Sequence, residues 1–264
     1  MSTLKNKVII VTGSSTGIGR AIAIACVAAG ARVVVHGRNA PACAELVAQL
    51  GRDHAVAHVE DLSADGCPQR LVDAAISTFG QLHGIVNNAA FIGTGNIHDT
   101  DAALFMKMIE VNALAPFLLI KAALQELEKT RGTVLNIGSV NAYSGEPDLL
   151  PYAVSKGALM TLTRNLGDTL LRENGVRVNQ LNVGWVLTEN EAQRKRGHGL
   201  PPDWESALPK VYAPAGRILR PEEIAATVVF WLSDAGGPIS GQAWDLEQYP
   251  FIGRNPPKDS AIIS

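Results

Sequence analysis

The alternation of apolar strands with helical segments is the feature that most constrains the fold of this chain. An apolar run at residues 8–11 leads into a glycine-rich turn, and residues 18–29 then repeat apolar side chains at helical spacing up to Gly30. The alternation continues with strands at residues 32–35, 55–59, 85–88, 133–137, 177–182 and 242–246, and with helices at residues 41–50, 68–79, 101–128, 151–172 and 221–233. Apolar strands alternating with helices are typical of parallel sheets that carry helices on both faces. The sequence therefore predicts an α/β protein, a Rossmann-like doubly wound parallel sheet in a single domain over residues 1–264.

Size and charge limit the partners that such a chain can bind. Its 264 residues are 47% hydrophobic and 18% charged, and the formal net charge is -2. A surface for nucleic acid or for anionic membranes needs a large basic excess, which is absent. The N-terminus shows no secretory leader pattern, and we expect no apolar run long enough to span a bilayer. We therefore expect a cytoplasmic protein with a small-molecule ligand and neither a nucleic-acid nor a membrane partner.

The three cysteines, Cys26, Cys43 and Cys67, do not have the spacing of metal ligands. Cys26 lies on an apolar helix face. We therefore predict three reduced structural thiols and no metal site.

The first strand is followed by the turn TGSSTGIGR at residues 12–20. Gly13, Gly17 and Gly19 have the spacing GxxxGxG, and the missing side chains let the backbone approach a pyrophosphate at the start of a helix. The alternative is a tight turn that needs positive φ angles and one close contact between helix and strand. Its position in the first strand-to-helix turn favours a nucleotide. The predicted cofactor contacts here are Gly13, Ser15, Thr16, Gly17, Ile18 and Gly19.

The end of the second strand, VVVHGRN, bears on the choice between NAD and NADP. NAD-selecting dinucleotide folds carry an acid there for the ribose 2′-hydroxyl. Here Gly37 takes that place and Arg38 follows, so a guanidinium is available for a 2′-phosphate. We predict NADP, with NAD possible; the alternative for Arg38 is a solvated surface residue. Asp61 and Leu62 are expected to flank the adenine, although Asp61 could equally cap a helix.

Several motifs, taken together and in order, resemble those of the short-chain dehydrogenase/reductase family, and the resemblance covers nearly the whole chain. They are the turn at residues 12–19, NNAA at residues 87–90, Asn112, Ser139, and Tyr152 followed by Lys156. The resemblance implies an NAD(P)-dependent enzyme that interconverts an alcohol and a carbonyl compound, and a homo-oligomer, either a tetramer or a dimer.

Tyr152 and Lys156 are four residues apart on a predicted helix, so they share one face. A tyrosine with a pKa of about 10 is a poor base at neutral pH, but a nearby lysine and an oxidised nicotinamide both favour its phenolate. The resemblance implies that Tyr152 exchanges the substrate proton, that Lys156 also binds the nicotinamide ribose, that Ser139 holds the substrate oxygen, and that Asn112 anchors a water. The alternative for the pair is a half-buried tyrosine and a solvated lysine.

The resemblance also assigns cofactor contacts to Asn88 and Ala89, to the backbone of Val186 and to the hydroxyl of Thr188. Two segments depart from the family pattern. In NVGWVLT, Val183 stands in place of a proline, which puts the rigidity of that loop in doubt. Residues 246–249, LEQY, stand where many relatives have a VDGG-like sequence.

Substrate choice is expected to lie in residues 91–96, in residues 141–150 and in a long irregular lid at about residues 185–216. These stretches are rich in hydrogen-bonding groups, which favours a sugar, a polyol or a related hydroxy compound. For residues 194–196 we expect a solvated surface. The C-terminal tail, residues 248–264, mixes apolar residues with prolines and is predicted to dock over a pocket. The alternatives are a 3-oxoacyl thioester or steroid-like substrate, or a catalytically silent nucleotide-sensing protein.

Overall fold

The computed structural model describes residues 3–197 and 199–254, and its centre is a seven-stranded sheet in which every recorded strand pair is parallel. The strands are β1 Val8–Val11, β2 Arg32–Gly37, β3 Ala55–Val59, β4 Gly84–Asn87, β5 Thr133–Ser139, β6 Arg177–Val183 and β7 Ala243–Leu246. Their order in the sheet is β3-β2-β1-β4-β5-β6-β7. The direction of winding reverses between β1 and β4, which is the point where open α/β sheets bind ligands.

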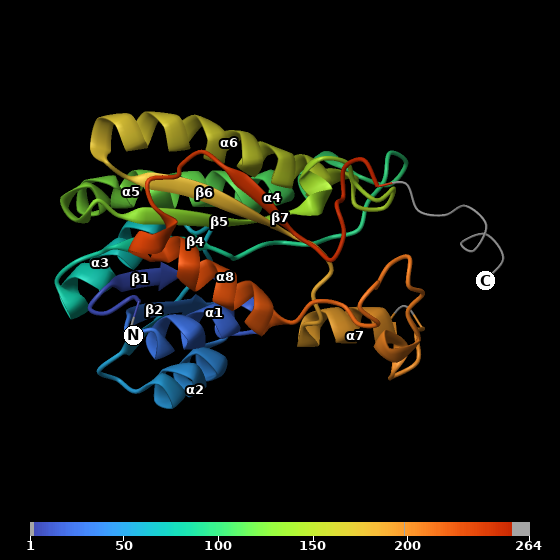
Figure 1. Ribbon diagram of the computed structural model, residues 1–264, viewed down its shortest axis with the longest axis horizontal. Helices are drawn as coiled ribbons and strands as arrows, with labels where there is room; N and C mark the ends of the chain where they lie inside the picture. Colours follow the sequence, from blue (N-terminus) through green and yellow to red (C-terminus); the bar gives the residue numbers. More distant parts are fainter. Residues whose placement is uncertain (1–2, 198, 255–264) are drawn as a thin grey trace.

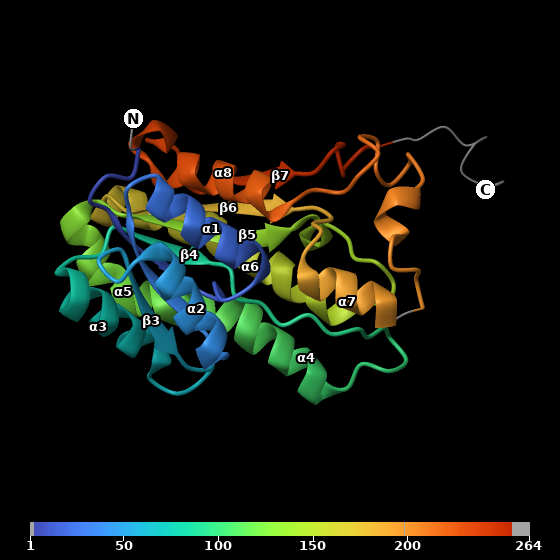
Figure 2. The same ribbon diagram turned by 90° about the horizontal axis from the view of Figure 1, so that it is seen from below.

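Helices cover both faces of the sheet, as the sequence predicts. They are α1 Gly17–Ala28, α2 Ala40–Leu50, α3 Cys67–Phe79, α4 Ala102–Ile109, α5 Ala115–Thr130, α6 Leu150–Asn174, α7 Glu189–Gly197 and α8 Pro221–Leu232. Helices α1, α2 and α8 lie on one face, and α3, α5 and α6 lie on the other (Figures 1 and 2). Helix α7 lies beyond the sheet, on the side towards which the strands point (Figure 1). The predicted doubly wound fold is confirmed.

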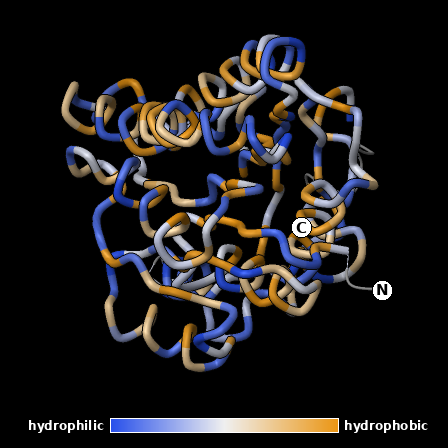
Figure 3. The backbone as a smooth tube through the Cα atoms, turned by 90° about the vertical axis from the view of Figure 1, so that its left-hand side faces the viewer, coloured by the Kyte–Doolittle hydropathy of each residue, from blue (hydrophilic) through white to orange (hydrophobic). Residues whose placement is uncertain are grey.

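Two cores result from the two-residue period of the strands. In β1, Ile9 and Val11 face the α1 and α8 side, whereas Val8 and Ile10 face the α3 and α5 side. All four are fully buried. Burial of each such side chain stabilises the fold by about 1.5–3 kcal/mol. The helices expose one face and bury the other, and their colour accordingly alternates between hydrophobic and hydrophilic in Figure 3.

The predicted helix at residues 101–128 is instead α4, a π-helical turn at Glu110–Leu114 and α5 in one continuous run. By length and composition, the run Ala102–Thr130 could cross a membrane, so the expectation that no apolar run is long enough was wrong. Its apolar side chains have another explanation, because Leu119, Ile120 and Leu127 pack in the core against the sheet.

The predicted irregular lid is more ordered than expected. Residues 185–216 contain α7 and a 3-10 turn at Trp204–Ala207. The Trp185 and Trp204 rings stack with their centroids 5.3 Å apart, and Trp204 is buried with Ala213 and Ile218. The lid therefore has a small core of its own, which no helical period in the sequence indicated.

The three cysteines are free and buried, as predicted. Burial raises the pKa of Cys26 to about 12, so this thiol is inert at neutral pH. Of the predicted tail, residues 255–264 lie outside the described residues. In the described part, the Arg254 guanidinium lies 3.5 Å from the centre of the Tyr249 ring.

Candidate active site

The glycine-rich turn is held tightly against the end of β4. Gly13 and Gly17 have φ angles of 62° and 55°, which favour glycine. A Cβ at Gly13 would lie 2.8 Å from the Ala89 Cα, and one at Gly19 would overlap the Gly13 carbonyl oxygen. Packing within the protein is therefore enough to explain why glycine occupies positions 13 and 19, as the alternative of a tight turn with one close contact requires.

The amide of Asn88 keeps this turn in place. Its Nδ2 donates to the carbonyl oxygens of Thr12 at 2.9 Å and of Gly13 at 3.1 Å. The backbone N–H groups of Asn88 and Ala89 both donate to Thr12 Oγ1 at 3.0 Å. In this structure Asn88 and Ala89, both predicted cofactor contacts, position the turn.

The start of α1 suits an anion. Its N-cap residue, Thr16, has an extended backbone, its side chain makes no capping hydrogen bond, and the first turn carries no acid. The first backbone N–H groups of α1, which follow Ser15 and Thr16 and include that of Ile18, are thus available to bind an anion. The positive end of the helix dipole lies at the same place. These donors fit the pyrophosphate of a dinucleotide.

At the end of β2, a side chain in place of Gly37 would have to displace the Ser15 side chain. A Cβ at Gly37 would lie 2.7 Å from Ser15 Oγ. The Arg38 side chain is 75% exposed, and its Nη1 lies 3.8 Å from the Asp61 carboxylate. Asp61 also accepts from the N–H and hydroxyl of Ser63 at 2.9 and 2.7 Å, which lowers its pKa. These bonds close a turn before α3, whose N-cap residue is Gly66, so Asp61 is not the helix cap that the alternative proposed. Its neighbour Leu62 is buried in the core.

His36, in β2, was missed by the sequence analysis. The Gly13 N–H donates to His36 Nδ1 at 3.2 Å, and His36 Nε2 lies 3.1 Å from the Glu60 carbonyl oxygen. Burial lowers the pKa of His36 to about 4, so the ring is neutral and its Nε2–H donates to Glu60. The signal was a polar residue inside the apolar run VVVHG.

Ser139, Tyr152 and Lys156 come together at the ends of two elements. Ser139 closes β5, and the other two lie in the first two turns of α6. All three are buried, and Tyr152 forms a hydrogen bond with Ser139. Lys156 Nζ lies 5.8 Å from the centre of the Tyr152 ring and donates to the Ile137 carbonyl oxygen at 2.8 Å. The alternative of a solvated lysine is therefore wrong.

Burial controls the protonation of this group. It raises the pKa of Tyr152 to about 12, against the opposing effects of the Ser139 hydrogen bond and the positive charge of Arg194. It also lowers the pKa of Lys156 to about 8. We expected the lysine to favour the phenolate, but here burial outweighs it. Without further positive charge, Tyr152 is a neutral proton donor at neutral pH.

Asn112 lies in the π-helical turn and is fully hydrogen-bonded. Its Oδ1 accepts from the Phe91 N–H at 2.8 Å, and its Nδ2 donates to the Phe91 carbonyl oxygen and to Ser155 Oγ, both at 2.9 Å. Ser155 in turn donates to the Tyr152 carbonyl oxygen at 2.7 Å. Asn112 thereby connects the segment after β4 to the helix turn that carries Tyr152.

The two departures from the family pattern meet at the base of the lid. The Trp185 N–H, two residues after Val183, donates to Glu247 Oε2 at 2.9 Å. Gln248 accepts from the Ala215 N–H at 3.0 Å and donates to the Arg217 carbonyl oxygen at 2.7 Å. Hydrogen bonds from residues 247 and 248 thus hold both ends of the lid, where the missing proline had put rigidity in doubt.

The predicted contacts Val186 and Thr188 lie at the start of the lid. Val186 is buried and pairs with Leu219 in a β-bridge. The hydroxyl of Thr188 accepts from the Glu191 N–H at 3.1 Å. A Cβ at Gly17 would lie 3.4 Å from the Thr188 Cγ2, so this part of the lid adjoins the glycine-rich turn.

Arg194 was expected to be a solvated surface residue, and this expectation was wrong. Its Nε and Nη2 donate to the two oxygens of Glu191 at 3.0 and 3.1 Å, and Glu191 also accepts from Trp185 Nε1 at 2.8 Å. Its charge lowers the pKa of Tyr152. Nothing in the sequence distinguishes Arg194, because Arg194, Lys195 and Arg196 form one continuous basic run.

One cluster has the donor atoms of a metal site. Atoms of His58, Glu60 and Cys67 lie within 4.8 Å of one another. However, Arg70 already pairs with both oxygens of Glu60, at 3.1 and 2.5 Å. Burial, with the nearby Glu60, raises the pKa of Cys67 to about 12, which disfavours the thiolate that a metal needs. The absence of a metal site stays a prediction.

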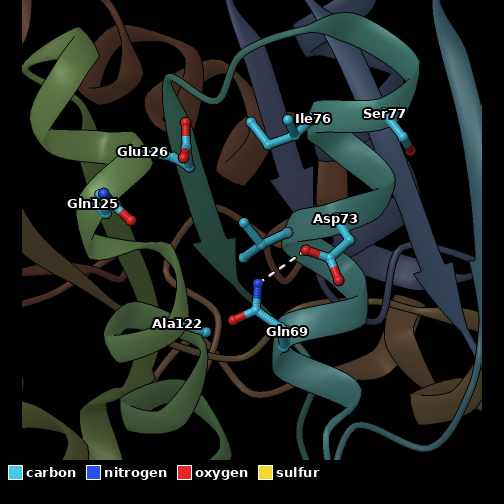
Figure 4. A pocket seen from close by; sticks show the side chains of 8 residues that line it. Gln69, Asp73, Ile76, Ser77, Ala122, Gln125 and Glu126 are labelled. Carbon is cyan, nitrogen blue, oxygen red and sulfur yellow. Dashed lines mark hydrogen bonds between the residues drawn. The ribbon is translucent and has the colours of Figure 1, made fainter.

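Two surface hollows lie apart from the catalytic group. Figure 4 shows one of about 390 Å³ between α3 and α5, where Gln69 donates to Asp73 at 2.9 Å. A second, of about 420 Å³, is lined by residues of the segment 141–147 and by the outer face of α6. Ser139, Tyr152 and Lys156 line neither hollow, so we assign no role in the chemistry to either.

Comparisons with known proteins find a matching family model, curated relatives and a solved structure of the same fold. Residues 13–247 match the model of a family described as enoyl-(acyl carrier protein) reductase. A 2-(S)-hydroxypropyl-CoM dehydrogenase from Xanthobacter autotrophicus is 37% identical, with 92% of this chain and 96% of that protein covered. L-fucose dehydrogenase of Mus musculus is 35% identical, with 87% and 83% covered. The crystal structure of L-sorbose reductase from Gluconobacter frateurii shares the fold, with a TM-score of 0.87, 24% identity, and 94% and 97% covered.

Proposed function

The chain belongs to the short-chain dehydrogenase/reductase family, which binds NAD(P) and acts on CH–OH groups, and on this premise we propose an NADP-preferring enzyme. It transfers a hydride between nicotinamide and the carbonyl/alcohol pair of a sugar, a polyol or a similar hydroxy compound. The observation that carries the proposal is the buried group of Ser139, Tyr152 and Lys156 at the carboxyl end of the sheet.

The preference for NADP is supported by the end of β2. Gly37 stands where an acid would bind a ribose 2′-hydroxyl and repel a 2′-phosphate, and a side chain there would have to displace that of Ser15. The exposed guanidinium of Arg38 follows directly and can reorient, because its only ion pair among residues 3–197 and 199–254, to Asp61, is 3.8 Å long. An exposed pair of this kind contributes about 0–1 kcal/mol, so a 2′-phosphate displaces it readily.

A hydroxy substrate is supported by a relative and by the polar groups at the site. The name of one relative at 35% identity gives L-fucose, a sugar, as its substrate. In this chain the buried Asn141 lies two residues after Ser139, and its backbone N–H donates to Ser139 Oγ at 3.1 Å. Such groups disfavour a purely apolar ligand, because polar groups that are buried without hydrogen-bond partners cost free energy. A 3-oxoacyl thioester or a steroid-like ketone would need an entrance to the active site that is lined by apolar side chains.

The protonation states define the roles of the side chains. In reduction, the neutral Tyr152 phenol donates its proton to the substrate oxygen while the Ser139 hydroxyl holds that oxygen in place. Bound NADPH supplies the hydride, and NADP⁺ accepts it in the reverse direction. Lys156, with a pKa of about 8, returns a proton to Tyr152 through a water placed near Asn112. Oxidation needs the phenolate, so its rate rises with pH.

The experiment is a titration with NADPH and NADH followed by a turnover panel of sugars, polyols, short ketones, acyl thioesters and steroids. We expect tighter binding of NADPH and turnover of hydroxy compounds. In Tyr152→Phe, cofactor binding persists, and turnover falls by a factor of about 10² or more because the proton donor is lost. Preference for NADH would refute the role of Arg38. Binding without any turnover would favour the catalytically silent alternative.

A further inference from the structure

Arg194 and Lys195, in the last turn of α7, form the subject of this inference; we call them the lid cations. Helix α7 begins directly after Thr188, which adjoins the glycine-rich turn through Gly17. Its other end carries Arg194, which is close enough to the catalytic tyrosine for its charge to act on the Tyr152 phenol. Figures 1 and 2 show α7 beyond the ends of the strands, and these two observations connect one end of the helix to the predicted cofactor site and the other to the proton donor.

The guanidinium of Arg194 is held in place but is not saturated. The Glu191 carboxylate accepts hydrogen bonds from Nε and Nη2, and it also accepts one from Trp185 Nε1 at 2.8 Å. Trp185 is stacked on the buried Trp204, so this arrangement is anchored in the small core of the lid. Among residues 3–197 and 199–254, Arg194 Nη1 donates to no acceptor. The side chain is 35% exposed, so Nη1 can reach a ligand.

The local charge balance is positive. Lys195 Nζ lies 5.0 Å from the centre of the Trp185 ring and has no carboxylate within ion-pair distance in the described part of the chain. Glu191 neutralises one of the two lid cations and leaves the other uncompensated. An anion between them thus gains a charge-assisted hydrogen bond from Nη1 and the field of Lys195.

We propose that the lid cations bind an oxyanion group of the substrate, a carboxylate, a sulfonate or a phosphate, at the end opposite the reacting carbon. This inference rests on the proposed function and narrows its substrate class to hydroxy or oxo acids, including aldonates. The acid group binds at α7 while the hydroxyl or carbonyl oxygen contacts Ser139 and Tyr152. Arg194 then determines specificity, and Glu191 positions it.

The kinetic test compares matched substrates that differ in charge: a hydroxy acid with its methyl ester, and an aldonate with the alditol of the same length. We expect the native enzyme to prefer the acid of each pair. In Arg194→Met, kcat/KM for the acid falls about 10- to 100-fold, mainly through KM, while kcat/KM for the neutral partner changes much less, and only through the loss of the Arg194 charge that lowers the Tyr152 pKa. Arg194→Lys restores part of the loss, since lysine keeps the charge but lacks the planar fork.

The matched control is Arg196→Met, two residues further along. Arg196 is exposed, and within the described residues its side chain has one recorded hydrogen bond, from Nε to the Ala192 carbonyl oxygen at 3.2 Å. This variant keeps the native preference for acids. Equal losses of kcat/KM for the acid in Arg194→Met and Arg196→Met would show that the effect depends only on net surface charge. That result would overturn the proposal.

A binding test separates this inference from the proposed function, because it needs no turnover. Propane-1-sulfonate and butyrate are titrated calorimetrically into protein saturated with the nicotinamide nucleotide, with butyramide as the neutral control. Anion binding that is lost in Arg194→Met but kept in Arg196→Met supports the site even if no substrate turns over. Tyr152-dependent turnover of neutral hydroxy compounds, without anion binding or preference for acids, would uphold the proposed function and refute the lid site.

Discussion

At the scale of single residues, the burial of Lys156 lowers the stability of the fold, although the proposed chemistry needs this lysine. It is 3% exposed, and burial lowers its pKa from 10.5 to about 8, so its charged form is disfavoured in the fold. A lysine whose pKa is lowered on folding binds fewer protons folded than unfolded between about pH 8 and 10.5. Stability at this site is therefore lowest below pH 8, and it rises with pH through that window. Tyr152, whose pKa is raised to about 12, has the opposite effect: its contribution to stability falls as the pH rises from about 10 to 12.

We predict that Lys156→Met abolishes turnover and yet stabilises the protein at pH 7. The shift of about 2.5 pH units sets an upper limit of about 3 kcal/mol for the gain, reduced by the lost hydrogen bond to the Ile137 carbonyl oxygen. Urea unfolding at pH 7 and pH 9.5 measures it, and the gain should be smaller at pH 9.5. A loss of stability at both pH values would contradict this account.

The order of the motifs, through its resemblance to the short-chain dehydrogenase/reductase family, singled out Ser139, Tyr152 and Lys156, and their catalytic roles stay predictions. Arg194 could not be selected. Its neighbours Lys195 and Arg196 have the same charge, and only the pairing of Arg194 with Glu191 and its proximity to Tyr152 distinguish it. His36 was missed for a related reason, since its partners, Gly13 and Glu60, are distant along the chain.

At the scale of elements, the lid is anchored by residues that the sequence analysis identified as departures from the family pattern. The strand β7 leads directly into Glu247 and Gln248, which hydrogen-bond to opposite ends of the lid. The glycine of a VDGG-like sequence has no side chain that could bind Ala215 and Arg217. Strands and helices were predictable from their periods, whereas the order in the lid depends on contacts between Trp185 and Trp204 that have no period.

We predict that Gln248→Gly loosens the lid without changing the catalytic group. Loss of two hydrogen bonds weakens the anchoring by about 1–3 kcal/mol, so KM rises and trypsin cleaves the lid faster at its exposed basic residues. Gln248→Glu is the informative control, because it keeps the acceptor for the Ala215 N–H and loses the donor to the Arg217 carbonyl oxygen. Its cleavage rate should be intermediate. Unchanged KM and cleavage in both variants would show that the lid does not need this contact.

At the scale of the whole molecule, cofactor binding connects the two halves of the sheet. The adenosine end is expected at β2 and β3, and the nicotinamide end at β5, α6 and the lid, on opposite sides of the point where the winding reverses. A ligand that bridges these parts binds the folded state alone. It therefore stabilises the fold by about 2.7 kcal/mol at a concentration of 100 times its Kd.

The choice of cofactor can accordingly be read from the stability of the whole protein. We predict that NADPH raises the melting temperature more than NADH at equal concentration, and that Arg38→Ala lowers the NADPH increment to that of NADH. The reason is that the Arg38 guanidinium would be the charge facing the 2′-phosphate, while the rest of the site contacts groups that both nucleotides share. Arg172→Ala, on the exposed end of α6 where Arg172 pairs with Asp168, controls for loss of a surface charge. Equal increments in the native protein would instead indicate that Arg38 acts as the solvated residue that its 75% exposed side chain also permits.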